Sequence, residues 1–322
     1  MLVTINAADA VSGVKTAYYS LDGTNFQPYT APFTVDPFKS PVVYAFADDN
    51  VANRSGLITY YPSVSSNQID NAQFFVRQHY LDFLNREPDS SGLAFWTNEL
   101  TSCGSNAQCQ EVKRINVSAA FYLSIEFQQT GYLAYRAYKA AFGNIQGKPV
   151  PITREEMLSD MQQIGQGVVV GVGDWEQRLE QNKRAFFDQL VTRERFTTSY
   201  SQAMTPEQFV DALNANAGGA LSQAERDALV NDLKSSAKTR ARVLQAVAED
   251  ADLARAETNK AFVLMQYFGY LRRNPNDQPD TDFSGWQFWL SKLDQFNGNF
   301  VKAEMVKAFL SSIEYRQRFS AN

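Results

Sequence analysis

The sequence predicts a multidomain β + α protein in which a small N-terminal β-sandwich precedes an all-α helical repeat region. Short apolar stretches alternate with turn residues over residues 1–63, which is typical of antiparallel strands. Apolar residues then recur at helical spacing, and the stretch that begins at Phe75 recurs in related form from Phe262. The predicted divisions are a β-sandwich at 1–63, a linker and helix cap at 64–72, a first helical unit at 73–145, connecting helices at 146–204, and two helical units, one of them degenerate, at 205–322.

Five stretches of the N-terminal segment are rich in β-branched and aromatic residues and are separated by turn residues such as Asp22-Gly23. The strands expected there are Leu2 to Ala7, Lys15 to Tyr19, Thr34 to Val35, Val42 to Ala47 and Leu57 to Tyr61. Through runs such as Asp9 to Lys15 and Tyr44 to Asp49, the segment resembles the immunoglobulin-like modules of bacterial surface and secreted proteins. The resemblance implies a spacer or an accessory binding module.

The first predicted helix has its apolar residues on one face. Asp70 or Asn71 is expected to cap its start, because Asp and Asn side chains accept hydrogen bonds from free backbone N–H groups there. Val76 and Phe83 are seven residues apart, which places both on the same side of the helix. Pro88 ends the helix, because it biases the residue before it away from helical backbone angles.

A second and a third helix complete the predicted unit. Asp89 or Ser90 is expected to cap the second helix, on which Phe95 and Trp96 are both predicted to point back at the first helix. The third helix is expected to run from Val112 to Gln129. The unit is therefore predicted to be a helix, a tight Pro-Asp or Pro-Asn corner, a helix that carries Phe-Trp, a loop, and a helix that ends in Ser-Ile-Glu-aromatic.

The same order of features recurs near the C-terminus. An aromatic helix leads to Asn274-Pro275, the pair Phe288-Trp289 follows an inserted loop, and Val306 to Tyr315 matches the third helix. A degenerate set with the same spacing and no Trp lies between residues 205 and 248. The helical region is thus predicted to be built from copies of one unit.

These residues resemble a bacterial family catalogued as domain of unknown function 4214. The family pattern is an aromatic helix, a Gly-Arg-(Glu/Asn)-(Pro/Ala)-Asp corner, a Ser-Gly or Ala-Gly pair and an aromatic-Trp pair. Here Asn85 stands where the family commonly has Gly. The resemblance is strong at Phe75 to Trp96 and at Phe262 to Trp289. It implies exported, often surface-associated proteins, and binding or assembly rather than one chemistry.

The chain has two cysteines, Cys103 and Cys109, which lie six residues apart in a turn-rich polar segment. With only one His in the chain, they cannot complete a zinc site of the Cys/His type. We therefore expect a disulfide, and such bonds persist in oxidising compartments. Two free thiols in a cytosolic loop are the alternative.

The formal charge is −5 at pH 7, and Lys and Arg are scattered, so no nucleic-acid partner is expected. No stretch approaches the roughly 20 apolar residues of a transmembrane helix, so no transmembrane segment is expected. No signal sequence precedes the first predicted strand. The chain is therefore either cytosolic, or a fragment or misannotated start of a longer exported protein. The cysteines favour an extracellular or cell-surface location.

The best candidate for metal binding is a loop in the C-terminal copy. Asp280, Asp282 and Ser284 alternate before Gly285, as in the first half of a calcium-binding loop. The bidentate Glu expected at the twelfth position is Ser291, so calcium would be held weakly. Helix capping by the two aspartates is the alternative that we favour, and no other cofactor is expected.

No catalytic residue is expected. His79 lies mid-helix, although a Ser-His-Asp or Cys-His arrangement would have to use it. An enzyme would instead need a cleft that gathers acids such as Glu126, Glu314 and Asp282. The glycine-rich run Gln166 to Gly173 is expected to be a short extended element whose glycines turn the backbone. A phosphate loop is not expected, because no Gly-Lys-Ser/Thr follows.

These observations predict a non-catalytic, extracellular or cell-surface protein whose helical region binds a partner or helps to assemble a surface layer. The expected partner is a protein or a polysaccharide. The alternative is an accessory region, carbohydrate-binding or spacer, of a larger secreted hydrolase.

Overall fold

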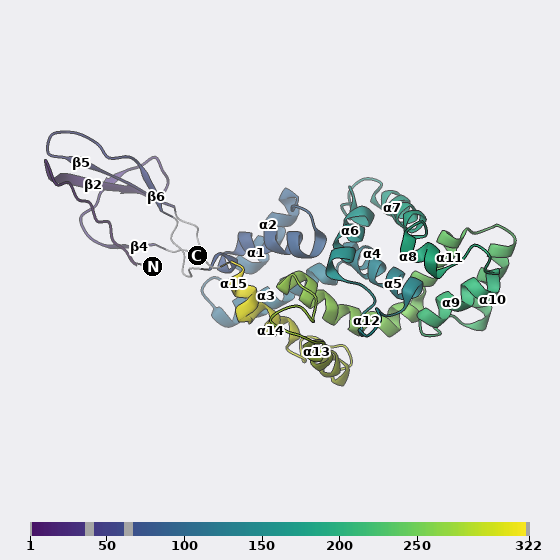
Figure 1. Cartoon of the computed structure of the whole chain (residues 1–322). Coiled ribbons are helices and arrows are strands. Elements are labelled where there is room, and N and C mark those ends of the chain that lie inside the picture. Colours follow the sequence, from purple (N-terminus) through teal and green to yellow (C-terminus); the bar gives the residue numbers. More distant parts are fainter. Residues whose placement is uncertain (1, 36–41, 61–66, 320–322) are drawn as a thin grey trace.

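The computed structural model describes residues 2–35, 42–60 and 67–319. Two small antiparallel sheets come first, and a longer helical region follows (Figure 1). This order confirms the predicted change from strands to helices. Residues 64–66 of the predicted linker lie outside the described residues.

The N-terminal region is built from short strands in two sheets. The strands are β1 (Leu2–Val3), β2 (Val14–Ser20), β3 (Gln27–Pro28), β4 (Phe33–Thr34), β5 (Val43–Asp49) and β6 (Ile58–Tyr60). β1 pairs with β4, and the second sheet has the order β3-β2-β5-β6. In its centre Tyr18 lies opposite Phe46. The sequence did not predict β3, because a polar Gln and a Pro carry no strand signal; only pairing with β2 makes this segment a strand.

A small core joins the two sheets. Val3 and Val35 meet Val43 there, with further partly buried apolar side chains around them. The rings of Tyr19 and Phe33, one from each sheet, stack with their centroids 3.9 Å apart. The predicted strand from Leu2 is only two residues long, because beyond Val3 the chain leaves the sheet.

Over residues 67–319, the helical region contains α-helices together with one 3₁₀ turn and two π-helical turns. They are η2 (Gln68–Asp70), α1 (Ala72–His79), η3 (Tyr80–Leu84), α2 (Ser90–Thr101), α3 (Ala107–Tyr122), α4 (Ile125–Gln129), α5 (Gly131–Phe142), α6 (Arg154–Gly165), α7 (Trp175–Leu190), α8 (Glu194–Ser199), α9 (Pro206–Asn216), α10 (Gln223–Lys234), α11 (Arg240–Ala248), α12 (Ala251–Gln266), η4 (Tyr267–Leu271), α13 (Ser284–Gln295), α14 (Met305–Ser311) and α15 (Ile313–Gln317).

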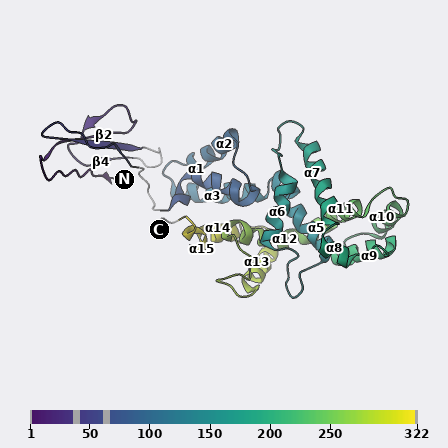
Figure 2. The same cartoon turned by 45° about the horizontal axis from the view of Figure 1, so that its top comes forward.

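Two parts of this region have matching element orders. We call residues 67–130 unit one and residues 251–319 unit two; each contains a helix that becomes a π-helical turn, then three further helices. The two units lie side by side, and the helices between them extend to the far end of the molecule (Figures 1 and 2). Arg316 donates two hydrogen bonds of 2.8 Å to the Asp70 carboxylate, so the C-terminal helix packs next to the start of unit one.

The helical core is continuous from unit one through the middle helices to unit two. α5 lies at its centre, since Leu133, Ala134 and Tyr135 are fully buried and most of the helix surface is covered. Among the described residues, no helix is both long and apolar enough to cross a membrane.

Each unit departs from the predicted helices in two places. The first helix turns into a π-helix at Tyr80 and at Tyr267, and each π-turn ends at a residue with a left-handed backbone, Asn85 (φ 51°) and Arg272 (φ 55°). The predicted third helix breaks before α4, because the extended backbone of Ser124 starts a new helix there. The predicted caps are confirmed, since Asn71 caps α1 and Asp89 caps α2.

The glycine-rich run at residues 166–173 was predicted to be a short extended element whose glycines turn the backbone; the turning is confirmed, and the extended element is wrong. The run forms successive turns between α6 and α7. Gly167, Gly171 and Gly173 all have positive φ angles, which interrupt an extended chain.

Candidate functional site: two matched arginine corners

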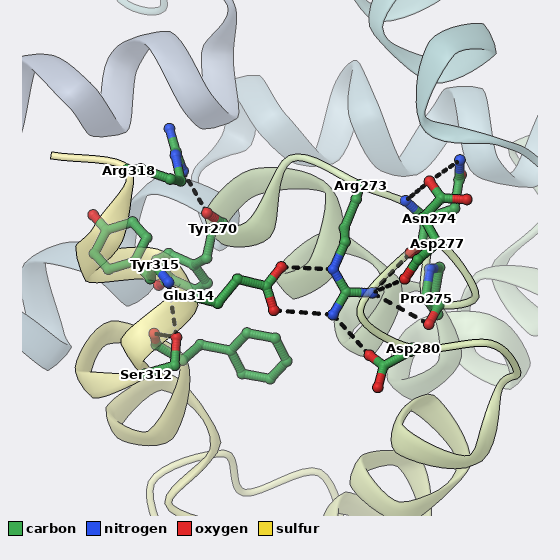
Figure 3. Close-up of polar contacts among 11 residues, drawn as sticks. Tyr270, Arg273, Asn274, Pro275, Asp277, Asp280, Ser312, Glu314, Tyr315 and Arg318 are labelled. Atoms are coloured by element: carbon green, nitrogen blue, oxygen red, sulfur yellow. Dashed lines mark hydrogen bonds and ion pairs between the residues drawn. The ribbon is translucent and has the colours of Figure 1, made fainter. Parts of the chain in front are cut away.

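An arginine follows the π-turn in each unit and forms an ion pair with a glutamate from the last short helix of that unit. We call this arginine and the groups that it contacts the arginine corner of the unit. Arg86 Nε and Nη2 donate to Glu126 Oε1 and Oε2 over 2.7 and 2.9 Å. Arg273 makes the same two bonds to Glu314 over 2.6 and 3.0 Å (Figure 3). A forked guanidinium and a carboxylate match in geometry, so this pair fixes both distance and orientation.

A serine places each glutamate. Ser124 Oγ accepts a hydrogen bond from the Phe127 N–H, and Ser312 Oγ accepts one from the Tyr315 N–H, both over 3.1 Å. Each serine therefore starts a short helix whose first turn carries the glutamate. The break that the sequence did not predict is what aims Glu126 at its arginine.

The corner in unit two gathers more oxygen atoms than the corner in unit one. Arg273 Nη2 also donates to Asp280 over 2.7 Å, and Nη1 faces the carbonyl oxygens of Asn274, Pro275 and Asp277 at 3.1, 3.4 and 3.0 Å (Figure 3). Burial opposes the charge of this arginine, but the bonds to Glu314 and Asp280 raise its pKa. The guanidinium is thus the cation around which the inserted loop is folded.

In unit one the corresponding contacts are fewer. The Arg86 guanidinium approaches Asp89 at 3.8 Å and donates to the Glu87 carbonyl over 3.2 Å. The hydrogen bonds to Glu126 raise the pKa of Arg86, although burial opposes them. Because unit one has a short turn in place of the inserted loop of unit two, fewer backbone carbonyl groups reach the Arg86 guanidinium.

A tyrosine lies beneath each guanidinium and touches the next helix. The arginine carbon lies 4.9 Å from the ring centre of Tyr80 and 5.5 Å from that of Tyr267. A methyl group added at Gly92 would lie 2.2 Å from the Tyr80 hydroxyl, and one at Gly285 would lie 2.7 Å from the Tyr267 hydroxyl. Burial, together with the charge of nearby Asp280, raises the pKa of Tyr267 to about 12. Glycine at these two positions lets the tyrosine reach the helix.

The two residues of the aromatic pair on the second helix of unit one have different environments. Trp96 packs on Phe121 with ring centres 5.9 Å apart, whereas Phe95 is 58% exposed. The prediction that both residues point back at the first helix is therefore wrong for Phe95. Successive residues of an α-helix are turned by about 100°, so neighbouring side chains cannot both face one partner.

The calcium candidate residues are engaged in other contacts. Asp280 bonds to Arg273, and Asp282 Oδ1 accepts from the Ser284 N–H over 2.8 Å at the start of α13. The hydrogen bonds from Ser284 lower the pKa of Asp282. Within the described ranges, no three His, Cys, Asp or Glu side chains gather closely enough to hold a metal ion. Calcium binding stays a prediction.

His79 lies between the two units and is 1% exposed. Its Nδ1 lies 2.8 Å from the Phe75 carbonyl oxygen, which requires the proton on Nδ1, so Nε2 accepts from the Ser118 hydroxyl over 2.7 Å. Ser118 Oγ in turn contacts the Tyr270 hydroxyl of unit two. Burial lowers the pKa of His79 to about 3, and the charges of nearby arginines act in the same direction. The ring is thus a neutral part of the interface between the units.

The acids that an enzyme would need are not gathered in one cleft. Glu126 and Glu314 are bonded to separate arginines, and Asp282 lies at a helix start. The two cysteines form a disulfide that joins Cys103, in the turn after α2, to Cys109 in the first turn of α3.

The sequence did not identify Asp82 as a site residue. Its side chain is 1% exposed and accepts hydrogen bonds from Arg272 Nε over 2.8 Å, Arg318 Nη2 over 2.9 Å and Gln78 Nε2 over 2.8 Å. Both arginines belong to unit two, so Asp82 links the units, as do the ion pairs Asp70–Arg316 and Glu111–Lys307. The sequence offered one signal for this role: Asp82 is next to Phe83, which lies on the predicted apolar face, and a buried acid needs a partner.

Comparison with known proteins gives one match. No curated protein and no solved structure is similar to the chain at a significant level. The profile of one family, described as Domain of unknown function (DUF4214), matches residues 62–130, which contain the whole of unit one. Residues 62–130 are therefore a DUF4214 domain.

Proposed function

We propose that this chain is a non-catalytic binding or assembly protein that acts outside the cell or at its surface. One observation supports the proposal most strongly: the matched glutamates of the two units both form structural ion pairs. Glu126 and Glu314 each form a two-point bond with an arginine, which holds a short helix in place. Carboxylates held in this way support a scaffold and are poorly placed to move protons.

The disulfide supports the proposed location. Cys103 and Cys109 close a loop of six residues' separation, and such bonds persist where the surroundings are oxidising. The resemblance of the helical region to exported bacterial proteins points in the same direction.

Unit two is proposed to be a second copy of the domain found in unit one. The support is the matched set of contacts: an arginine after the π-turn, a serine-capped short helix and a glycine beneath a tyrosine. The N-terminal sheets are proposed to be an immunoglobulin-like spacer, since their core is only a few side chains deep. A spacer also suits the alternative function, an accessory region of a larger secreted hydrolase; a catalytic domain encoded upstream of Met1 would favour that alternative.

Co-sedimentation of the purified protein with isolated bacterial envelopes tests the proposal. We expect saturable binding and no release of soluble sugar or peptide from the envelopes. The variants Glu126→Gln and Glu314→Gln are the decisive controls, because they keep size and shape but remove the charge. Turnover that disappears in either variant without loss of folding would show an enzyme, and binding that never saturates would contradict a specific binding protein.

A further inference from the structure

Two exposed phenylalanines occupy matched places in the two units. Phe95 in α2 and Phe288 in α13 each precede the tryptophan of the aromatic pair, and each is 58% exposed. Single exposed apolar side chains are common on protein surfaces, so the informative observation is the matched position of these two rings. The same exposure at equivalent positions of two units that differ elsewhere indicates a shared use.

Each exposed ring packs against the tryptophan that follows it. Phe95 meets Trp96 edge to face, with centroids 4.9 Å apart and planes at 78°, and Phe288 meets Trp289 at 5.1 Å and 74°. Each tryptophan rests in turn on a phenylalanine of the third helix, at 5.9 Å in unit one and 5.7 Å in unit two. A ring that is already oriented loses little conformational entropy when a ligand stacks on it.

No apolar side chain lies three or four residues from either ring along its own helix. The positions three and four residues away on the same helices are Ser91, Gly92, Asn98, Glu99, Ser284, Gly285, Ser291 and Lys292. An apolar partner helix would need a row of apolar residues at these positions. A lone ring with a polar rim instead fits a sugar ring, whose face carries C–H groups and whose edge carries hydroxyl groups.

We propose that Phe95 and Phe288 are the stacking platforms of two equivalent sites for the sugar rings of a neutral polysaccharide. This inference rests on the proposed binding function and names its ligand class. A neutral polymer is favoured because the chain carries a formal charge of −5 at pH 7, which disfavours the approach of polyanions.

The arrangement of the two sites implies cross-linking. α2 and α13 lie on opposite sides of the helical region in both views, with α3 and α14 between them (Figures 1 and 2). Because the two sites belong to helices on opposite sides of the region, the proposal assigns them to different polymer chains. Binding at two sites raises the overall affinity well above that of one ring, and it joins chains only when both sites act.

The test uses the full chain with four soluble neutral polymers, a β-glucan, a xylan, a mannan and a dextran, and with alginate as an anionic control. Affinity electrophoresis measures binding, and light scattering measures cross-linking. We expect the natural protein to bind and cross-link at least one neutral polymer in preference to alginate. Phe95→Ala and Phe288→Ala are each expected to keep binding but stop cross-linking, and the double variant is expected to bind at least about tenfold more weakly.

Ile125 and Ile313 provide matched controls, because they are 56% and 75% exposed at equivalent positions and carry no ring. Their double alanine variant should bind and cross-link normally. Cross-linking that survives in either single Phe variant, equal loss in the Ile variant, preference for alginate, or no binding to any neutral polymer would each overturn the inference. Envelope binding that persists in the double Phe variant would leave the proposed function intact while this inference fails.

Discussion

Units one and two share the arginine corner but differ where they touch each other. Asp82 of unit one and Gly269 of unit two occupy the same place in their π-turns. Asp82 receives two arginines from unit two, whereas Gly269 receives the Phe83 ring of unit one, which would lie 2.3 Å from an added methyl group. The arginine corner therefore stabilises the fold of each unit. The third residue of each π-turn, Asp82 or Gly269, determines how the two units pack against each other.

The units also hold their last loops in different ways. In unit one the Cys103–Cys109 disulfide closes the turn between the second and third helices. In unit two the chain between α13 and α14 is held by packing, with Ala303 fully buried and Phe300 stacked near Phe262 at 5.6 Å. A covalent bond in one copy thus corresponds to apolar burial in the other.

Removing a charge that links the units should have the largest effect. Asp82→Ala leaves the largely buried Arg318 and the partly exposed Arg272 without their carboxylate. We expect a loss of about 3–5 kcal/mol in the free energy of unfolding, measured by urea denaturation. Glu87→Ala is the control, because Glu87 pairs with Arg77 at the surface and should cost less than about 1 kcal/mol. Equal losses in the two variants would show that Asp82 does not hold the units together.

The two corners should differ in strength. Arg273 is 10% exposed and contacts two carboxylates and several carbonyl groups, whereas Arg86 is 23% exposed and has fewer partners. We expect Arg273→Ala to cost about 3 kcal/mol and Arg86→Ala about 2 kcal/mol, since each leaves partly buried oxygen atoms without a donor. Lysine should not restore either corner, because it lacks the planar fork. A larger loss in the Arg86 variant would reverse the ranking.

Acid should weaken the interface through His79. Its pKa is about 3 when folded and 6.5 in the unfolded chain, so the folded state binds the proton less tightly. The stabilisation is complete above pH 6.5 and falls by about 1.4 kcal/mol per unit as pH drops toward 3.

The matched residue of unit two supplies the variant. Gln266 cannot titrate, and its Nε2 donates to the carbonyl four residues earlier over 3.2 Å, as His79 does with Phe75. Between pH 7 and pH 5, wild-type protein should lose about 2 kcal/mol more than His79→Gln in urea denaturation. Identical losses would show that another group controls acid unfolding.

Reduction of the disulfide should have a smaller effect. The closed loop is short, so breaking it frees the unfolded chain by roughly 2 kcal/mol at most. We expect the unfolding midpoint to fall in reductant. The double variant Cys103→Ser and Cys109→Ser should show the same lower midpoint, and reductant should not change it further. Unit two has no cysteine, so its packing should be unaffected. If reductant leaves the unfolding midpoint unchanged, the proposal that the protein works in an oxidising compartment loses its main physical support.

The order of elements could be predicted from sequence because local chemistry encodes it. Asn71 and Asp89 cap their helices as the residue types suggest, and the cysteines pair as their spacing suggests. The π-turns could not be predicted, since a π-turn has no composition signal of its own and depends on what packs against it.

The contacts that make the site were hidden for a different reason. The sequence marks Arg86 and Glu126 as parts of one repeated pattern, but they meet across forty residues, and helical periodicity says nothing about partners at that separation. The exposure of Phe95 was missed because an aromatic pair looks apolar as a whole, while the helix can bury only one of its two rings.

Calcium tests the difference between the two corners most finely. The inserted loop of unit two has the alternating acids of a calcium loop, but Asp280 already bonds to Arg273, whose guanidinium takes the place of a cation there. We therefore expect millimolar calcium or a chelator to leave the unfolding midpoint of the natural protein unchanged. In Arg273→Ala the freed Asp280 and Glu314 retain their charges, so calcium should recover part of the lost stability by mass action. A rise in the natural protein would instead assign Asp280, Asp282 and Ser284 to a calcium site that coexists with the arginine.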